Sequence, residues 1–160
     1  MAVREILTAD DQLLKRKSRR ILDIDNDVLE LIQDLKDTLY AGDGVGLAAP
    51  QIGVLKRVFI IDLRNGEEPL ILLNPKIIRK IGQYADREGC LSYPGYEGDV
   101  VRPKKVVVTG MNEKGNIIQY EALGLMARAI CHETDHLDGI LYMDIAKKIY
   151  KLQQEPVKEI

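Results

Sequence analysis

The chain has 160 residues, of which 46% are hydrophobic and 30% charged, values typical of a globular domain that buries its own core. Its net charge of −2, with well-mixed signs, argues against direct nucleic-acid or membrane binding. The first twenty residues lack the apolar stretch of a signal peptide, and no apolar run approaches membrane-spanning length. We therefore expect a cytoplasmic, monomeric protein with a single domain over residues 1–160.

The N-terminal part is expected to be helical. Residues 10–18 predict a short helix, and the basic residues near its end are expected to be solvated rather than bound to RNA, since no aromatic or glycine-rich context accompanies them. A longer helix should begin near Asp25 or Asn26, either of which can cap it, because apolar residues then recur at spacings of three and four. Gly42 is expected to end this helix.

Strands are expected to dominate the middle of the chain. The segment 55–63 is β-branched and apolar, as in a buried strand. Four further segments are expected to be strands: 69–78, 98–103, 104–112 and 116–122. The last two should form a hairpin whose turn is the sequence NEKG. The segment 43–53 shows neither helical nor strand periodicity.

Helical spacing returns at residues 122–137, and Gly139 is expected to close this helix. Its positions other than the histidines read as Leu, Met, Ala and Ile, so we expect it to be largely buried. The tail that follows is weakly patterned, and Pro156 limits any helix there. Together these elements predict an α+β fold, a single domain in which antiparallel or mixed β-sheets pack around a buried C-terminal helix.

This C-terminal helix carries both histidines of the chain, His132 and His136, with Glu133 beside the first. Residues four apart lie on one face of a helix, so both imidazoles can converge on one point. Two nitrogen ligands and an adjacent carboxylate are typical of a metal-hydrolase site. The alternative is two surface histidines with a solvated glutamate, but the apolar character of the helix makes two unpaired imidazoles costly.

A metal site of this kind needs a third ligand, and no further histidine exists. Asp144 and Glu155 could complete a site with two histidines and one carboxylate. Cys90 is favoured because it lies in a loop bounded by glycine and proline, where a thiolate can be presented. Cys131 points about 100° away from His132 and is expected to lie in the core, unpaired in a reducing compartment.

Two histidines and a thiolate leave a fourth position for water, and Fe²⁺ fits such a site as well as Zn²⁺. The bound water has a lowered pKa, and Glu133 is expected to take its proton as general base. The resulting hydroxide would attack a carbonyl carbon, whose oxygen then needs hydrogen-bond donors nearby.

Three segments resemble the signature motifs of the peptide deformylase family, in the family's order: GVGLAAPQIG (44–53), EGCLSYPG (88–95) and HETDHLDG (132–139). Members of this family remove the formyl group from N-formylmethionine at the start of nascent polypeptides and release formate. The resemblance implies that Cys90, His132 and His136 bind the metal, with Fe²⁺ the usual ion and Zn²⁺ or Ni²⁺ as substitutes. It also implies that Glu133 acts as general base and later proton donor.

The same resemblance implies how the substrate is held. Gln51, through its side-chain amide, and Leu91, through its backbone N–H, would donate to the formyl oxygen. The substrate main chain would pair with the backbone around Val45 and Gly46, as an added strand. The walls of the pocket for the methionine side chain would be Val45, Leu125, Ala129 and the His132 ring. Glu88 and Arg102 resemble a pair that holds the metal loop.

Two regions depart from the family pattern. Tyr96 and Glu97 occupy the stretch where some members place a substrate-contacting arginine, so binding beyond the methionine is expected to depend on backbone contacts. Many members also end in a longer basic helix implicated in docking near the ribosomal exit. The short tail of this chain therefore leaves a transient ribosome association as an open expectation.

Two other functions remain as alternatives. A metallopeptidase with the HExxH motif would cleave internal peptide bonds, but the missing third histidine and the segments around Gln51 and Cys90 argue against it. A structural metal or peptide-binding module would need a closed site with four protein ligands, and the sequence offers no convincing fourth ligand.

Overall fold

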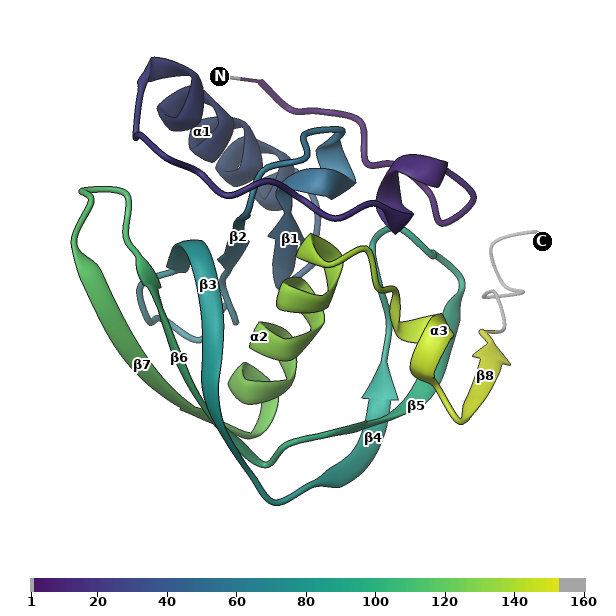
Figure 1. Ribbon diagram of the computed structural model, residues 1–160. Helices are drawn as coiled ribbons and strands as arrows, with labels where there is room; N and C mark the ends of the chain where they lie inside the picture. Colours follow the sequence, from purple (N-terminus) through teal and green to yellow (C-terminus); the bar gives the residue numbers. More distant parts are fainter. Residues whose placement is uncertain (1, 153–160) are drawn as a thin grey trace.

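A five-stranded sheet and a three-stranded sheet enclose the helix that carries the histidines (Figure 1). The computed structural model describes residues 2–152. The larger sheet has the strand order β1 (Gly46–Ala48), β2 (Val58–Ile61), β3 (Leu70–Ile81), β6 (Lys105–Met111), β7 (Ile117–Leu123). The smaller sheet has the order β4 (Tyr84–Glu88), β5 (Tyr96–Arg102), β8 (Lys148–Lys151). All neighbouring strands in both sheets are antiparallel.

Helix α1 (Asn26–Tyr40) packs against β1 and β2 of the larger sheet. Asp25 caps it, because its carboxylate accepts a hydrogen bond from the Val28 N–H at 2.9 Å. The apolar stripe of the helix is buried together with side chains of β2 and β3, in one of two hydrophobic clusters. This packing holds the 43–53 segment against the rest of the domain.

Helix α2 (Gly124–Leu137) lies between the two sheets (Figure 1). Ala127, Ile130 and Leu137 are fully buried in the second hydrophobic cluster, with side chains of β2, β3 and β6. Gly139, with φ of 76°, follows the helix in the left-handed conformation that ends it. The buried C-terminal helix and the α+β fold agree with the prediction.

The N-terminal segment lies across all three sequence motifs. Three backbone hydrogen bonds of 2.8 Å fix it: Leu7 N–H to Gln51 O, Ala9 N–H to Ser92 O, and Ser18 N–H to Leu137 O. Its short 3-10 helix η1 (Gln12–Lys15) buries Leu14. The chain end that is first in sequence therefore contacts the glycine-rich segment, the Cys90 loop and the end of α2.

The structure contains short elements that the sequence patterns did not predict, and two expectations about helices were inaccurate. Residues 10–18 form only the single turn η1. The segment 43–53 contains strand β1 and the 3-10 helix η2 (Ala49–Ile52), and these two elements are too short to show a periodicity in the sequence. The tail forms α3 (Tyr142–Ile145) and strand β8, which pairs with β5. Helix α2 also contains a buried arginine, Arg128, rather than only apolar residues around its histidines.

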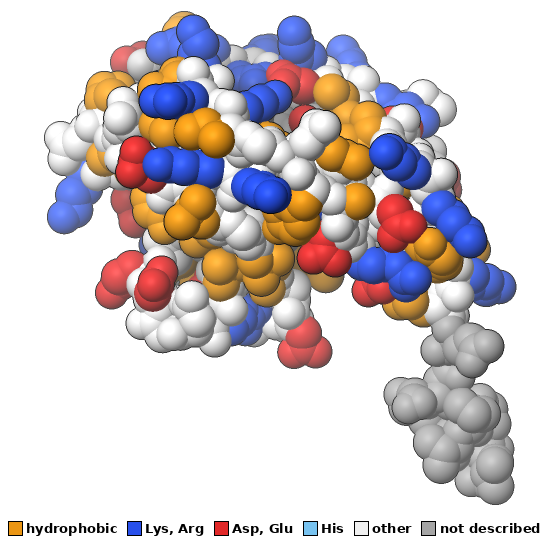
Figure 2. All heavy atoms as spheres, turned by 90° about the horizontal axis from the view of Figure 1, so that it is seen from below, with side chains coloured by type: hydrophobic (Ala, Val, Ile, Leu, Met, Phe, Trp, Pro, Cys, Tyr) orange, Lys and Arg blue, Asp and Glu red, His pale blue; other side chains and the backbone are white. Residues whose placement is uncertain are grey.

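The surface carries mixed charges. Basic and acidic side chains alternate with hydrophobic ones over the face seen from below Figure 1 (Figure 2). Among residues 2–152, no helix is long and apolar enough to cross a membrane. Pro156 and Glu155 lie outside the described residues, so the expectations attached to them remain predictions.

Candidate active site

Cys90, His132 and His136 come together although the first histidine follows the cysteine by 42 positions in the sequence. Their potential ligand atoms all lie within 4.8 Å of one another, and Cys90 Sγ is 3.4 Å from His136 Nε2. The histidines project from one face of α2, while Cys90 lies in the loop between β4 and β5. Asp144, the other described candidate for a third ligand, instead accepts a hydrogen bond from the Leu141 N–H at 2.9 Å.

This group of side chains fits a tetrahedral metal ion. An ion about 2.3 Å from a thiolate sulfur and about 2.0 Å from an imidazole nitrogen places those two atoms about 3.5 Å apart. Cys90 and His136 show a separation of 3.4 Å. Burial lowers the pKa of His136 well below its usual range, which favours the neutral ring that binds metal.

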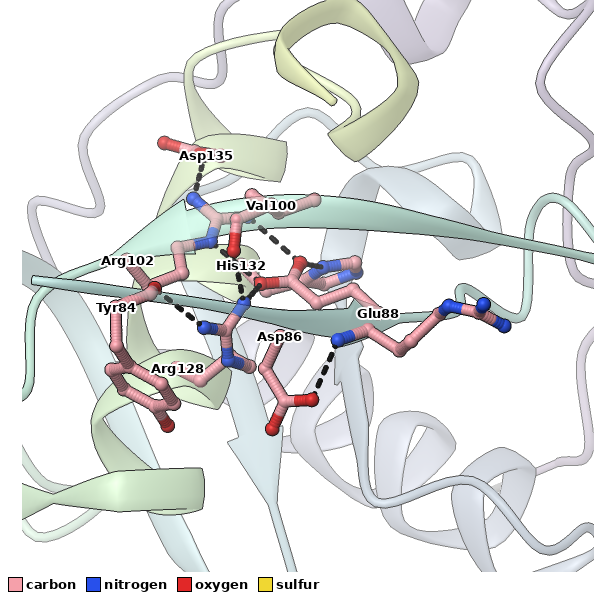
Figure 3. Close-up of polar contacts among 9 residues, drawn as sticks. Tyr84, Asp86, Glu88, Val100, Arg102, Arg128, His132 and Asp135 are labelled. Carbon is pink, nitrogen blue, oxygen red and sulfur yellow. Dashed lines mark hydrogen bonds and ion pairs between the residues drawn. The ribbon is translucent and has the colours of Figure 1, made fainter. Parts of the chain in front are cut away.

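His132 is oriented by a buried carboxylate, Glu88 (Figure 3). The Nδ1–H of His132 donates to Glu88 Oε1 at 2.8 Å, which leaves Nε2 as its ligand atom. Arg102 donates to both oxygens of Glu88, at 2.8 Å and 2.9 Å. Burial alone would raise the pKa of Glu88, but the hydrogen bonds from Arg102 and His132 lower it to about 2, so the carboxylate stays ionised.

Glu133 lies beside this group and has an unusual environment for a carboxylate. It is 4% exposed, and its Oε1 has no hydrogen-bond partner among residues 2–152. Burial raises the pKa of Glu133 to about 7, against the opposing effect of the nearby His132. A carboxylate with such a pKa can both accept and return a proton near neutral pH.

Gln51 reaches the cysteine from η2. Its side-chain Nε2 donates to Ser92 Oγ at 3.0 Å and lies 3.7 Å from Cys90 Sγ, while its Oε1 accepts from the Ala48 N–H at 3.0 Å. The amide is therefore fixed beside the metal-type cluster. The N–H of Leu91, next to Cys90, donates to no acceptor within the described part of the chain.

A cavity of about 390 Å³ opens beside these groups. Val45, Gly46, Leu125 and Ala129 line it, together with Gln51, Leu91, His132 and Glu133. Leu125 lines the cavity even though it is 57% exposed, because it stands on the first turn of α2 at the opening. The structure thus places every residue of the expected substrate site around one space.

Arg87 is a lining residue that the sequence analysis missed. It comes from β4 and lies 3.7 Å from Glu97, with its guanidinium 3.6 Å from the centre of the Tyr150 ring. Arg87 therefore lies beside the stretch of Tyr96 and Glu97, where some family members place a substrate-contacting arginine, although Arg87 comes from β4 and that stretch from β5. Only the pairing of β4 with β5 brings it there.

Arg128 and Asp135 were also missed, and both belong to the network around Glu88. Asp135 Oδ2 accepts from Arg102 Nη1 at 2.6 Å, and Arg128 Nη1 donates to Glu88 Oε2 at 2.7 Å. A signal for Arg128 exists in the sequence, since a charged residue four positions before His132 shares its helix face. Cys131 lies in the core as expected, and burial raises the pKa of its thiol to about 11.

Comparisons with known proteins agree with this geometry. The sequence model of the polypeptide deformylase family matches residues 3–152. Peptide deformylase 1 of Clostridium acetobutylicum is 52% identical over 144 residues, covering 90% of this chain and 95% of that protein. A peptide deformylase of Caldicellulosiruptor bescii is 47% identical over 159 residues, covering 99% of this chain and 93% of that protein.

Solved structures of peptide deformylases have the same fold as this chain. A crystal structure of a peptide deformylase from Legionella pneumophila superposes with a TM-score of 0.87 at 37% identity, covering 98% of this chain and 89% of that one. A peptide deformylase from Synechococcus elongatus, solved in complex with actinonin, superposes with a TM-score of 0.86 at 40% identity, covering 89% and 80% of the two chains. The chain belongs to the polypeptide deformylase family, whose members remove the N-formyl group from nascent peptides.

Proposed function

We propose that this chain hydrolyses the N-formyl group of N-formylmethionyl peptides with Cys90, His132 and His136 as metal ligands and Glu133 as the general base. The observation that carries this proposal is the position of Glu133. Its Oε1 has no hydrogen-bond partner among residues 2–152, and its side chain lines one cavity with Gln51 and with Cys90 and His132 of the three-residue ligand group. A divalent ion bound there would supply the Lewis acidity that brings the pKa of water near neutrality.

Glu133 takes the proton of the attacking water and later gives it to the departing amine. Its burial supports both steps, because a carboxyl pKa of about 7 is close to the working pH. Gln51 Nε2 and the Leu91 N–H donate to the formyl oxygen as negative charge develops on it. The hydrogen bond that the Ala48 N–H donates to Gln51 Oε1 supports this role, since it leaves the amide nitrogen directed toward Cys90.

The substrate backbone adds as a strand at the free edge of β1. The Val45 carbonyl accepts from the Asp62 N–H at 2.7 Å, on the side of β2. Backbone groups of successive residues in a strand point in opposite directions, so the N–H and C=O of Gly46 face away from β2 and toward the cavity side. The methionine side chain enters between Val45, Leu125 and Ala129, and Arg87 contacts residues beyond it.

Iron is the ion proposed for the native site, because a thiolate with two imidazoles suits Fe²⁺ and Zn²⁺ alike and the family resemblance favours iron. Zn²⁺ and Ni²⁺ are proposed as substitutes. The substrates are nascent chains in the cytoplasm, and the protein acts as a monomer with at most a transient contact with the ribosome.

The test is anaerobic purification, metal analysis and an assay of formate release from a formyl-Met-Ala peptide. The proposal predicts about one metal ion per chain and formate as the product, with no cleavage of internal bonds. Cleavage of internal bonds with intact formyl groups would favour the metallopeptidase alternative instead. Metal bound without any turnover would favour a structural site.

A further inference from the structure

Arg128 is a buried arginine one helical turn before His132 on α2. Only 3% of it is exposed, so its charge needs buried partners. Residues at i and i+4 leave a helix on the same face, and both side chains meet the same carboxylate, Glu88 (Figure 3). Arg128 is thus the neighbour of His132 both along the helix and across the hydrogen-bond network.

The hydrogen bond from Arg128 fills the last acceptor position of the Glu88 carboxylate. Its Oε2 accepts from Arg102 Nε at 2.8 Å and from Arg128 Nη1 at 2.7 Å. Its Oε1 accepts from Arg102 Nη2 at 2.9 Å and from His132 Nδ1 at 2.8 Å. An ionised carboxylate offers about four acceptor positions, so these bonds leave Glu88 one orientation. The orientation of the His132 ring follows from that of Glu88.

Arg128 also joins the helix to the hairpin that carries the cysteine. Its Nη1 donates to the Val100 carbonyl of β5 at 2.9 Å, and its Nη2 donates to the Tyr84 carbonyl of β4 at 3.2 Å. The guanidinium lies 4.7 Å from the centre of the Tyr84 ring. Cys90 follows β4 by two residues, in the loop that connects these two strands.

Arg102 and Arg128 differ in the elements that they connect. Arg102 and Glu88 both belong to the β4–β5 hairpin, and Arg102 reaches α2 only through Asp135, whose side chain is 25% exposed. Arg128 instead enters from the helix and bonds three acceptors of the hairpin, of which Glu88 and the Val100 carbonyl are buried and the Tyr84 carbonyl is partly buried. A planar guanidinium with five N–H donors can hold several acceptors in one fixed geometry.

We infer that Arg128 is a positioning residue of the metal site: through Glu88 it orients His132, and through the Tyr84 and Val100 carbonyls it sets the distance between α2 and the Cys90 loop. This inference rests on the proposed metal ligands. Arg128 also lines the cavity, but the inference gives it no contact with the reacting atoms.

The test measures Co²⁺ binding by competition with a chelator, and the thiolate-to-cobalt and d–d absorption bands, for the metal-free wild type, Arg128→Met and Arg128→Lys. Residues that orient a metal ligand typically change metal affinity by about 10–100-fold when replaced. We expect a loss in that range and shifted d–d bands for Arg128→Met. Arg128→Lys should show a smaller loss, because its ammonium keeps a positive charge and a donor for Glu88. Some loss should remain, because an ammonium cannot hold the same three acceptors in one plane.

Arg57→Met is the matched control. Arg57 also binds the end of α2, with Nη1 to the Leu137 carbonyl at 3.0 Å and Nη2 to Asp138 at 2.9 Å, but within residues 2–152 it forms no hydrogen bond with Glu88. It should lower the melting temperature while leaving Co²⁺ affinity and spectrum unchanged. If Arg128→Met does not fold without metal, Arg128→Lys decides the question by the same readouts.

A double-mutant cycle with Glu88→Gln separates the effect of Arg128 through Glu88 from its effect through the Tyr84 and Val100 carbonyls. If Arg128 acts through Glu88, the affinity loss of Arg128→Met should be much smaller in the Glu88→Gln background. Unchanged Co²⁺ affinity and spectrum in both Arg128 variants would overturn the inference and leave the proposed function intact. A wild type whose Co²⁺ complex lacks the thiolate band would overturn the proposed ligand set, and this inference with it.

Discussion

Gly46 lies against Glu133 so closely that a Cβ on Gly46 would be 2.5 Å from Glu133 Oε2. Real Cβ atoms do not approach an oxygen to that distance, so any side chain at position 46 must displace the carboxylate or strand β1. The glycine is therefore needed for the close approach between the edge of β1, where we propose that the peptide binds, and Glu133, the proposed general base.

Gly46→Ala should reduce kcat/KM by about 10²-fold, since a displacement of about 1 Å in a catalytic group costs a factor of that size. Metal content should stay at the wild-type level, because the three atoms nearest to a Cβ at position 46 all belong to Glu133, which is not one of the proposed ligands. Gly42→Ala is the control, since a Cβ there meets nothing within 4 Å. Formate release and metal analysis on both variants check the prediction, which a fully active Gly46→Ala protein would contradict.

Glu133→Gln should lower kcat by about 10²–10⁴-fold, the usual contribution of a positioned general base. The amide is nearly isosteric with the carboxylate, so the three ligand side chains should still bind metal. Single-turnover formate release with parallel metal analysis distinguishes this result from a loss of the ion. A variant that loses the metal along with its activity would assign Glu133 a different role.

The same variant should stabilise the metal-free protein at alkaline pH. The folded pKa of Glu133 is about 7, above its ordinary value of 4.5, so the folded state keeps a proton that the unfolded chain loses as pH rises from about 4.5 to 7. Wild-type stability should fall across this window, by at most on the order of 3 kcal/mol. Glu133→Gln removes that loss, so urea unfolding should show a difference at pH 8 that disappears at pH 4.

Iron-loaded protein should lose activity in air, while the Zn²⁺-loaded and Ni²⁺-loaded forms keep theirs. Cys90 is partly exposed beside an open cavity, so oxygen can reach both a redox-active ion and the thiolate. Time courses of formate release under air and under argon measure the effect. Stable activity of the iron form in air would indicate a different ion or a better-shielded sulfur.

Asn74→Ala should destabilise the fold by about 3 kcal/mol. Asn74 has φ of 51°, its Oδ1 accepts from the Ile21 N–H at 2.8 Å, and its Nδ2 donates to the Ile21 carbonyl at 2.8 Å. Each lost bond costs about 1 kcal/mol, and alanine adds about 1 kcal/mol in the left-handed conformation. Asn74→Asp keeps only the acceptor and should fall between the two in urea unfolding.

Sequence patterns predicted the elements that are long enough for an apolar spacing to repeat. Helix α1, strand β3 and the β6–β7 hairpin each repeat an apolar spacing over several residues, and each was found close to its expected place. Strand β1 has three residues and β8 four, which is too short for a pattern, and both exist because a neighbouring strand pairs with them.

The candidate site divides in the same way. His132, Glu133 and His136 could be assigned by spacing alone, and Cys90 by the shape of its loop. Arg128 and Asp135 could not, because Arg128 meets Glu88 and Asp135 meets Arg102 only through the packing of α2 against β5. Arg87 reaches the cavity for a similar reason, through the pairing of strands.

The hydrogen bonds of the N-terminal segment tie the order of folding to activity. Leu7, Ala9 and Ser18 hold the glycine-rich segment, the Cys90 loop and the end of α2, so residues near the start of the chain must meet residues near 137 before the site exists. Contacts across such sequence separations form slowly and late in folding. Recovery of turnover after refolding should therefore lag behind the return of helical structure and coincide with the formation of these three hydrogen bonds by the N-terminal segment.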